Sequence, residues 1–347
     1  MLDDLKLIHI RDAKDALGIA QNQWQQYMYD FKLSWTPPNI INKVVFVGMG
    51  GSGLAAKAYK DWLGLNVPFE IIQEYDLPNY IDNSTLLIVC SYSGNTEEAI
   101  TVFHKVTSQS EKADKNPMIV VVTSGGELRN YAEIANIPIL LLPTGLQPRM
   151  TLGYQLRALC EIFEACNFNK QSLTDIGIAS DWLKQKIEQW EPLVKTENNI
   201  AKKLALDLIG KSVIIYSSSK FFSVAYKWKI NFNENAKMLA WCNQLPEFNH
   251  NEFIGWTNMP VEKPFSIIDI RSSLDNLRIN KRFDITAQLL SGKRPNPETI
   301  ELEGESKIQQ ILWGIALGDF VSIYCAILGG IDPTSVDLIE EFKKRLI

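Results

Sequence analysis

The sequence contains little that could bind a metal or form disulfides. Its 347 residues include three histidines and five scattered cysteines, and no two cysteines form a Cys-x-x-Cys pair. Three histidines leave little room for a histidine-based metal site. An odd number of scattered cysteines is typical of reduced, buried thiols. We therefore predict a cytoplasmic protein with no metal site.

The chain also has no excess of basic charge. Lysine and arginine number 35 against 40 aspartate and glutamate residues, which gives a formal net charge of −5. A chain with this balance has no overall electrostatic reason to bind nucleic acid or an anionic membrane. Any phosphate that it binds must therefore be held by local geometry rather than by a basic surface.

One hydrophobic run is long enough to cross a membrane. It covers residues 311–331, but Asp319 lies near its middle and four glycines interrupt it. A central aspartate would cost about 2.5–3.5 kcal/mol on insertion. The N-terminus also lacks the basic-then-apolar layout of a signal peptide. We predict that the run is a core helix of a soluble domain.

The hydrophobic pattern of the first half alternates between strands and helices. Strands that are apolar throughout, separated by helices, indicate a parallel sheet that is covered on both faces. At about 150 residues per domain the length favours two domains, and we place an N-terminal helix and the first domain at 1–155. Helices are expected at segments such as 54–63 and 97–108, and strands at 44–47, 69–72, 85–90, 118–123 and 137–142.

The pattern becomes helical over 156–210 and alternates again over 211–347. The helical part includes a predicted helix at 181–190 and no Gly/Ser/Pro-rich linker. We expect a helical bridge and then a second, looser copy of the first architecture. The predicted fold class is α/β, with two doubly wound parallel sheets. The strands of the second domain are expected at 212–216, 238–241, 265–270 and 299–302.

A glycine-rich turn, GMGGSG at 48–53, follows the first predicted strand and opens a helix. Gly48, Gly50 and Gly53 satisfy the G-x-G-x-x-G pattern, and Glu74 ends the next strand, as in a dinucleotide-binding motif. The same geometry lets backbone N–H groups approach any anion. A dinucleotide, another phosphate ligand and a tight structural turn all remain open on this motif alone.

A second turn, SYSGNTEE at 91–98, favours a phosphate monoester. Ser91, Ser93 and Thr96 precede a predicted helix, where hydroxyls, free N–H groups and the helix dipole can hold a phosphate without a cation. The alternative is a capping box with Asn95 as N-cap and Glu98 at the third helical position. That alternative leaves the three hydroxyls unexplained.

These turns and several later segments resemble the bifunctional phosphoglucose/phosphomannose isomerase family, whose members carry two sugar isomerase (SIS) domains. The resemblance covers essentially the whole chain and implies two flavodoxin-like folds. It also implies an aldose–ketose isomerase that needs no cofactor and acts on glucose 6-phosphate, with mannose 6-phosphate as a further substrate. The supporting segments are GMGGSG (48–53), SYSGNTEE (91–98), QPR with LGY (147–154), NENAK (233–237), PEFNHNEFIGW (246–256) and LGDFVSIYCAILGGIDP (317–333).

The resemblance implies a role for each functional group that such an isomerase requires. Arg149 would stabilise the negative charge of the enediolate, and Glu234 would be the base that carries a proton between C1 and C2. His250 would open the sugar ring from the neighbouring subunit of a homodimer, and Lys343, or Lys344 beside it, would be the C-terminal active-site lysine. The phosphate-binding residues would be Gly51, Ser52, Ser91, Ser93 and Thr96.

Without the family resemblance, the same residues would be assigned no catalytic role. An isolated arginine, glutamate, histidine or lysine is more often a surface or helix-end residue, and a glutamate base would need partial burial to raise its pKa towards neutrality.

The sequence also departs from the family after the glycine turn, where it has LAAKA. A threonine linked to mannose 6-phosphate activity has no firm match, because helical spacing from Lys343 points to Val336 rather than Thr334.

Two other functions remain as alternatives. One is an SIS-type sensor that binds a phosphosugar without chemistry, although such proteins often carry a basic nucleic-acid-binding domain and this chain shows none. The other is a nicotinamide-dependent dehydrogenase, which is supported only by the pattern of the glycine turn.

Overall fold

The structure is a computed structural model that describes residues 1–108, 116–258 and 265–346. The chain divides into two compact units. One unit consists of residues 23–181, and the other combines residues 1–22 with 182–347. Helix α7 (Ser172–Ile187) contains the division, between Asp181 and Trp182.

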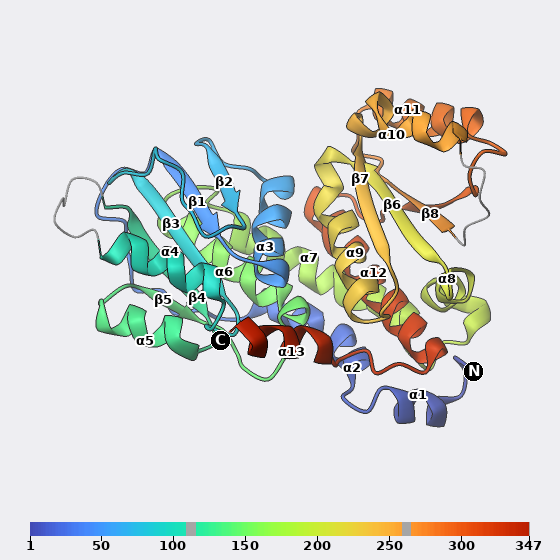
Figure 1. Cartoon of the computed structure of the whole chain (residues 1–347), viewed down its shortest axis with the longest axis horizontal. Helices are drawn as coiled ribbons and strands as arrows, with labels where there is room; N and C mark the ends of the chain where they lie inside the picture. Colours follow the sequence, from blue (N-terminus) through green and yellow to red (C-terminus); the bar gives the residue numbers. More distant parts are fainter. Residues whose placement is uncertain (109–115, 259–264, 347) are drawn as a thin grey trace. The chain divides into compact units, whose positions relative to one another are not determined.

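The unit formed by residues 23–181 contains a parallel five-stranded sheet with the order β2-β1-β3-β4-β5 (Figure 1). This is the flavodoxin-like order of a doubly wound sheet. The central strand β3 is buried along its whole length, because parallel strands are covered on both faces and select apolar, β-branched residues. The strands are β1 (Lys43–Val47), β2 (Phe69–Ile72), β3 (Thr85–Ser91), β4 (Met118–Thr123) and β5 (Ile139–Leu141).

Helices cover both faces of this sheet (Figure 1). Alternate residues such as Val45 and Leu87 pack against Phe103 of α4 and Leu128 of α5 in one apolar cluster. Helices α3 and α6 lie together on the other face. The helices of this unit are η1 (Gln23–Met28), α3 (Gly50–Trp62), α4 (Glu97–Thr107), α5 (Gly126–Ile134), η3 (Pro148–Met150), α6 (Leu152–Ala165) and the first part of α7.

The second unit repeats the plan with four parallel strands in the order β7-β6-β8-β9. The edge strand β7 begins two residues later than the sequence predicts and extends further, because Lys237 takes a left-handed conformation (φ 53°) that ends the preceding helix. Half-exposed polar residues fill much of β7, as an edge position permits. The strands are β6 (Ser212–Ser218), β7 (Ala240–Leu245), β8 (Phe265–Arg271) and β9 (Pro297–Glu301).

Helix α12 (Lys307–Gly329) is the core of the second unit. It is long and apolar enough to cross a membrane, but 89% of its most apolar window is buried inside the protein. A capping box of Ser306 and Gln309 starts it, and Gly330 in a left-handed conformation ends it. The other helices are α1 (Leu5–Arg11), α2 (Ala16–Gln21), η4 (Glu188–Trp190), η5 (Thr196–Asn198), α8 (Ile200–Leu208), η6 (Ser219–Phe221), α9 (Phe222–Glu234), η7 (Glu247–His250), α10 (Glu252–Gly255), η8 (Trp256–Asn258), α11 (Leu277–Leu289) and α13 (Asp337–Leu346).

The predicted fold class is confirmed, since both units contain doubly wound parallel sheets. The expected strands match the observed ones to within a few residues. The largest shift in a helix concerns the predicted segment 181–190. Helix α7 begins nine residues earlier, at Ser172, and ends at Ile187 before the short helix η4.

Candidate phosphosugar site

The glycine turn places Ser52 in the first helical turn of α3. Ser52 is buried, and its Oγ accepts a hydrogen bond from the backbone N of Tyr92, at 3.2 Å. Met49 is the N-cap of α3 and provides no side-chain cap. The start of this helix therefore keeps N–H groups that a side chain does not satisfy.

The second turn brings two of its three hydroxyls together. Ser91 ends β3 and is fully buried, and its Oγ lies 2.7 Å from Oγ1 of Thr96. It also accepts a hydrogen bond from the backbone N of Gly94, at 3.1 Å. Gly94 has φ +72°, and a Cβ there would lie 1.7 Å from the carbonyl oxygen of Gly125, so the turn requires glycine. Ser93 is exposed at the tip of the same turn.

The capping box considered for this turn is wrong. The N-cap of α4 is Thr96, not Asn95, and its side chain makes no cap hydrogen bond because the hydroxyl faces Ser91. Asn95 instead accepts a hydrogen bond from the backbone N of Glu127 at 3.0 Å, which joins the turn to the start of α5. The start of α4 is thus a second helix N-terminus without a side-chain cap.

Tyr92 connects the separate turns of this unit, and the sequence analysis did not single it out. Its backbone N donates to Ser52, and its hydroxyl donates to the carbonyl oxygen of Pro143 at 2.9 Å. The same hydroxyl accepts from the backbone N of Leu146, at 3.1 Å. These bonds tie the loop after β5 to the two turns that carry Ser52 and Ser91. The sequence feature that could have indicated this role is a tyrosine between two serines, in a turn where polar residues are expected.

Arg149 lies in the short helix η3 that follows this loop, and its side chain is almost fully buried. The turn packs directly on the first turn of α3. A Cβ on Gly51 would lie 2.9 Å from the backbone N of Arg149, so only glycine allows this approach. The structure therefore brings Gly51, Ser52, Ser91 and Thr96 together with the turn that carries Arg149.

This arrangement can bind a dianionic group without a basic surface. Two helix N-termini without side-chain caps meet at the carboxyl edge of the sheet, with buried hydroxyls between them. N–H groups and helix dipoles at such ends attract phosphate. The carboxyl edge, near the point where the strand order reverses, is also where doubly wound folds bind ligands.

Glu234 belongs to the other unit, where it ends helix α9 and is half-buried. Polar side chains on both sides of it anchor this end of α9 to α12. Asn231 donates to Oδ1 of Asp319 at 2.8 Å, and Asn235 donates to Oγ of Ser322 at 2.9 Å. Asp319 also forms an ion pair with Lys227, at 2.7 Å. These partners lie about 90 residues away along the chain, so no local sequence pattern indicates them.

His250 lies at the opposite end of the second sheet from Glu234. Helix α9 leads into the amino end of β7, where the backbone N of Ala240 donates to the side chain of Asn233 at 3.0 Å. His250 follows the carboxyl end of β7, in η7, and is exposed. The strand between them spans six residues, or about 20 Å at roughly 3.3 Å per residue. The structure therefore does not bring Glu234 and His250 together within one chain.

Lys343 lies on α13, which has no buried residue. Its Nζ is 3.0 Å from a carboxylate oxygen of Glu340, one turn earlier, and both side chains are more than half exposed. Lys344 is on the same helix. Neither lysine is distinguished from the other by burial or by a partner in the core.

A metal centre has no support in the described part of the chain. Among the residues with described positions, no three His, Cys, Asp or Glu side chains come close enough to hold a metal ion. All five cysteines are free thiols, and four of them are buried. Burial raises the pKa of Cys90 and of Cys160 to about 12, so these thiols stay protonated.

Comparison with known proteins adds to this geometry. Residues 197–346, which include Glu234, His250 and Lys343, match the family model described as the bacterial phospho-glucose isomerase C-terminal SIS domain. A curated relative from Caldicellulosiruptor bescii, named bifunctional phosphoglucose/phosphomannose isomerase, is 35% identical over 88% of this chain and 90% of its own length. The chain belongs to the bifunctional phosphoglucose/phosphomannose isomerase family. The resemblance seen in the sequence is therefore confirmed.

Two further comparisons find similar proteins with other names. A relative from Sulfolobus acidocaldarius, named D-glucosamine-6-phosphate 4-epimerase, is 31% identical over 66% of this chain and 69% of its own. The solved C-terminal domain of glucosamine-fructose-6-phosphate aminotransferase from Francisella tularensis has a TM-score of 0.67 and 14% identity, with 96% of this chain and 100% of that chain covered. At this level of identity the likeness shows that the two chains share a fold.

Proposed function

We propose that this protein is an aldose–ketose isomerase that interconverts glucose 6-phosphate, and also mannose 6-phosphate, with fructose 6-phosphate. The observation that carries the proposal is the pair of helix starts without side-chain caps around Ser52, Ser91 and Thr96, in a chain whose relatives are named phosphoglucose/phosphomannose isomerases. We assign the phosphate to these hydroxyls, to Ser93 and to the backbone N–H groups of the first turn of α3, at Gly51.

Glu234 carries the proton in the proposed reaction. In the open-chain aldose it removes the proton from C2, and the electron pair of that C–H bond forms the C1–C2 double bond of an enediolate. The same carboxyl returns the proton to C1, and the hydroxyl proton passes from O2 to O1, which gives the ketose. Arg149 stabilises the negative charge of the enediolate, and its burial strengthens this electrostatic effect. Lys343 is assigned to the same site through its match to the family.

His250 opens the sugar ring by moving a proton from the C1 hydroxyl to the ring oxygen. Because His250 and Glu234 lie at opposite ends of β7, we infer that His250 serves the site of the partner in a homodimer. An exposed position on a short turn after the sheet suits a residue that reaches another subunit. The five free thiols support a cytoplasmic location for the enzyme.

A side-by-side assay tests the proposal. Purified protein is given glucose 6-phosphate, mannose 6-phosphate and glucosamine 6-phosphate in separate reactions, and the products are identified by NMR. We expect fructose 6-phosphate from the first two and no 4-epimer from the third. Stabilisation by fructose 6-phosphate in a thermal-shift experiment, without any turnover, would instead identify a sensor. Stabilisation by NADH alone would point to a dehydrogenase.

A further inference from the structure

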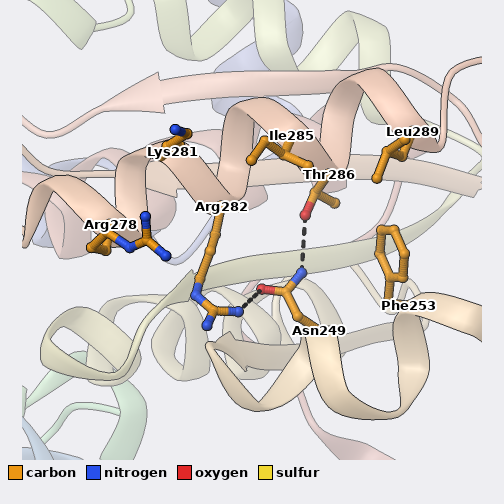
Figure 2. Close-up of a pocket in the computed structure, with 8 residues that line it drawn as sticks. All are labelled: Asn249, Phe253, Arg278, Lys281, Arg282, Ile285, Thr286 and Leu289. Carbon is orange, nitrogen blue, oxygen red and sulfur yellow. Dashed lines mark hydrogen bonds between the residues drawn. The ribbon is translucent and has the colours of Figure 1, made fainter.

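A cavity of about 330 Å³ lies beside the turn that carries His250, within the second unit. Helix α11 forms one wall, and residues of η7 and α10 form the other (Figure 2). The volume lies within the range of small-molecule sites in proteins. No sequence motif indicates this cavity, and the proposed isomerase reaction does not use it.

The cavity has an unusually basic wall for a chain with net charge −5. Arg278, Lys281 and Arg282 line it from α11, and their spacing of three and four residues places them on one helix face. Within the described ranges, none of the three forms an ion pair with a carboxylate. The one acidic residue of α11, Asp284, is paired with Arg271 at 2.9 Å. Positive charge therefore gathers here without a partner of opposite sign.

The acidic residues of η7 and α10, on the facing wall, are also engaged in hydrogen bonds: Glu247 accepts one from Asn251. Glu252, at the start of α10, accepts hydrogen bonds from Tyr216 and, at 2.7 Å, from Asn243. The remaining wall is apolar, with Phe253 from α10 and Ile285 and Leu289 from α11. A ligand that suits both walls carries an anionic group and an apolar or aromatic portion.

The cavity is connected to His250 through Asn249, which lines it (Figure 2). Nη1 of Arg282 donates to Oδ1 of Asn249 at 3.2 Å, and Nδ2 of Asn249 donates to Oγ1 of Thr286 at 3.0 Å. Thr286 is buried. These two bonds hold the residue immediately before His250 against α11. An anion that binds Arg282 competes with Asn249 for the same guanidinium.

We propose that this cavity binds a small organic phosphate with an aromatic portion, and that the ligand draws Arg282 away from Asn249 and so displaces the turn that carries His250. The binding site stands independently of the isomerase reaction. The predicted effect on rate rests on the proposed function, because it assumes that His250 opens the sugar ring.

Calorimetric titration of the full chain with metal-free ATP, pyrophosphate and adenosine tests the site. ATP should bind more tightly than pyrophosphate, and adenosine should not bind measurably. The double variant R278Q/K281Q should lose at least tenfold in ATP affinity. The matched variant K203Q/K211Q removes the same charge from exposed positions of the same unit and should bind ATP as the wild type does.

Three outcomes would overturn the site. Equal losses in both double variants would mean that ATP responds only to net charge. Competition between ATP and fructose 6-phosphate, with binding unchanged in R278Q/K281Q, would place the nucleotide in the substrate site. Binding of a ten-residue glutamate peptide, with no binding of ATP or pyrophosphate, would identify a surface for an acidic protein instead.

The coupling is tested by initial rates measured over a range of fructose 6-phosphate concentrations up to saturation. ATP should lower kcat without raising KM, and the effect should disappear in R278Q/K281Q when each protein is compared with its own ATP-free rate. Binding at the cavity without any change in kcat would disprove the coupling. Binding by a protein that isomerises no sugar phosphate would contradict the proposed function and leave the cavity assignment intact.

Discussion

At the scale of single residues, the candidate phosphate site is built from hydroxyl groups, because the chain has no excess of basic charge. Ser91 and Thr96 face each other at 2.7 Å, and Ser52 lies on the neighbouring helix start. Thr96 occupies an N-cap position without capping its own helix. Because the Thr96 hydroxyl faces Ser91 instead, the first N–H groups of α4 have no side-chain cap.

Replacing Glu234 by glutamine should abolish turnover, because an amide cannot take a proton from carbon. We expect kcat to fall by about 10³-fold or more, since positioned acid–base groups contribute on that order. Binding of fructose 6-phosphate, measured by calorimetry, should change by less than threefold on the same order-of-magnitude basis. Glu197→Gln, at an exposed position of the same unit, is the matched control and should keep wild-type rates. Wild-type turnover in Glu234→Gln would show that the base is another residue.

Tyr92→Phe tests the link between the turns. Removal of the hydroxyl leaves the Pro143 carbonyl and the Leu146 N–H without this partner, which should cost about 1–3 kcal/mol of stability. If Tyr92 positions the loop that leads to Arg149, kcat should also fall while the affinity for inorganic phosphate is retained. Denaturant unfolding and steady-state kinetics on the same preparation measure both effects. A loss of stability with an unchanged kcat would limit Tyr92 to a structural role.

At the scale of elements, the pairing of α9 with α12 is the interaction that positions Glu234. Trp228 donates from Nε1 to the carbonyl oxygen of Gly314 at 2.7 Å, and a Cβ on Gly318 would lie 2.4 Å from the Trp228 ring. Glycines therefore let the two helices approach closely. The buried pair of Lys227 and Asp319 lies in the same interface, so the glycines and Asp319 that interrupt the apolar run have a packing role.

Asp319→Ala should strongly destabilise the second unit. Lys227 is 1% exposed, and the substitution removes the carboxylate that pairs with its buried charge, which costs about 3–5 kcal/mol. Chemical denaturation followed by tryptophan fluorescence measures the change. The matched control is Asp284→Ala, whose carboxylate is 55% exposed in its pair with Arg271 and should contribute less than about 1 kcal/mol. Equal losses in the two variants would contradict the buried-pair interpretation.

At the scale of the whole molecule, the separation of Glu234 and His250 along β7 makes one chain insufficient for the proposed chemistry. An isologous homodimer supplies the missing residue twice, once to each site. In the proposed mechanism the two sugar isomerase units have different roles: the unit of residues 23–181 would bind the phosphate, and the other would provide the base and, to the partner subunit, the ring-opening histidine.

Mixed dimers of two inactive variants test this division. Glu234→Gln and His250→Ala should each be inactive alone. Unfolding and refolding the two together should restore about 25% of wild-type activity, because half of the dimers are then mixed and each has one complete site. Refolding each variant with itself is the control. If the mixture remains inactive, both residues serve the same chain's site.

Buried carboxylates make the stability of the molecule depend on pH. Burial raises the pKa of Asp269 to about 6, although the nearby Arg294 opposes the rise. Because the folded pKa is above the unfolded value near 3.8, the folded state binds more protons, and the contribution of Asp269 to stability falls as pH rises from about 4 to 6. The difference in unfolding free energy between wild type and Asp269→Asn should therefore decrease by about 2 kcal/mol over that interval. A pH-independent difference between the two proteins would contradict the shifted pKa.

The parallel sheets, the two turns rich in glycine and hydroxyl groups, and the family could all be predicted from the sequence alone. These features are local: apolar β-branched runs such as β3 specify buried strands, and glycines with hydroxyls specify turns at helix starts. The cap was misassigned because Asn95 has a long-range partner in Glu127 that no local rule includes.

Which distant residues meet depends on the tertiary structure. It joined Tyr92 to the loop before Arg149, placed Asp319 beside Lys227 and Asn231, and set Arg282 and Thr286 around Asn249. It also placed Glu234 and His250, 16 residues apart in the chain, at opposite ends of one strand. The physical reason is that short-range patterns fix the conformation of each segment, whereas contacts between segments depend on strand order and packing in the complete fold.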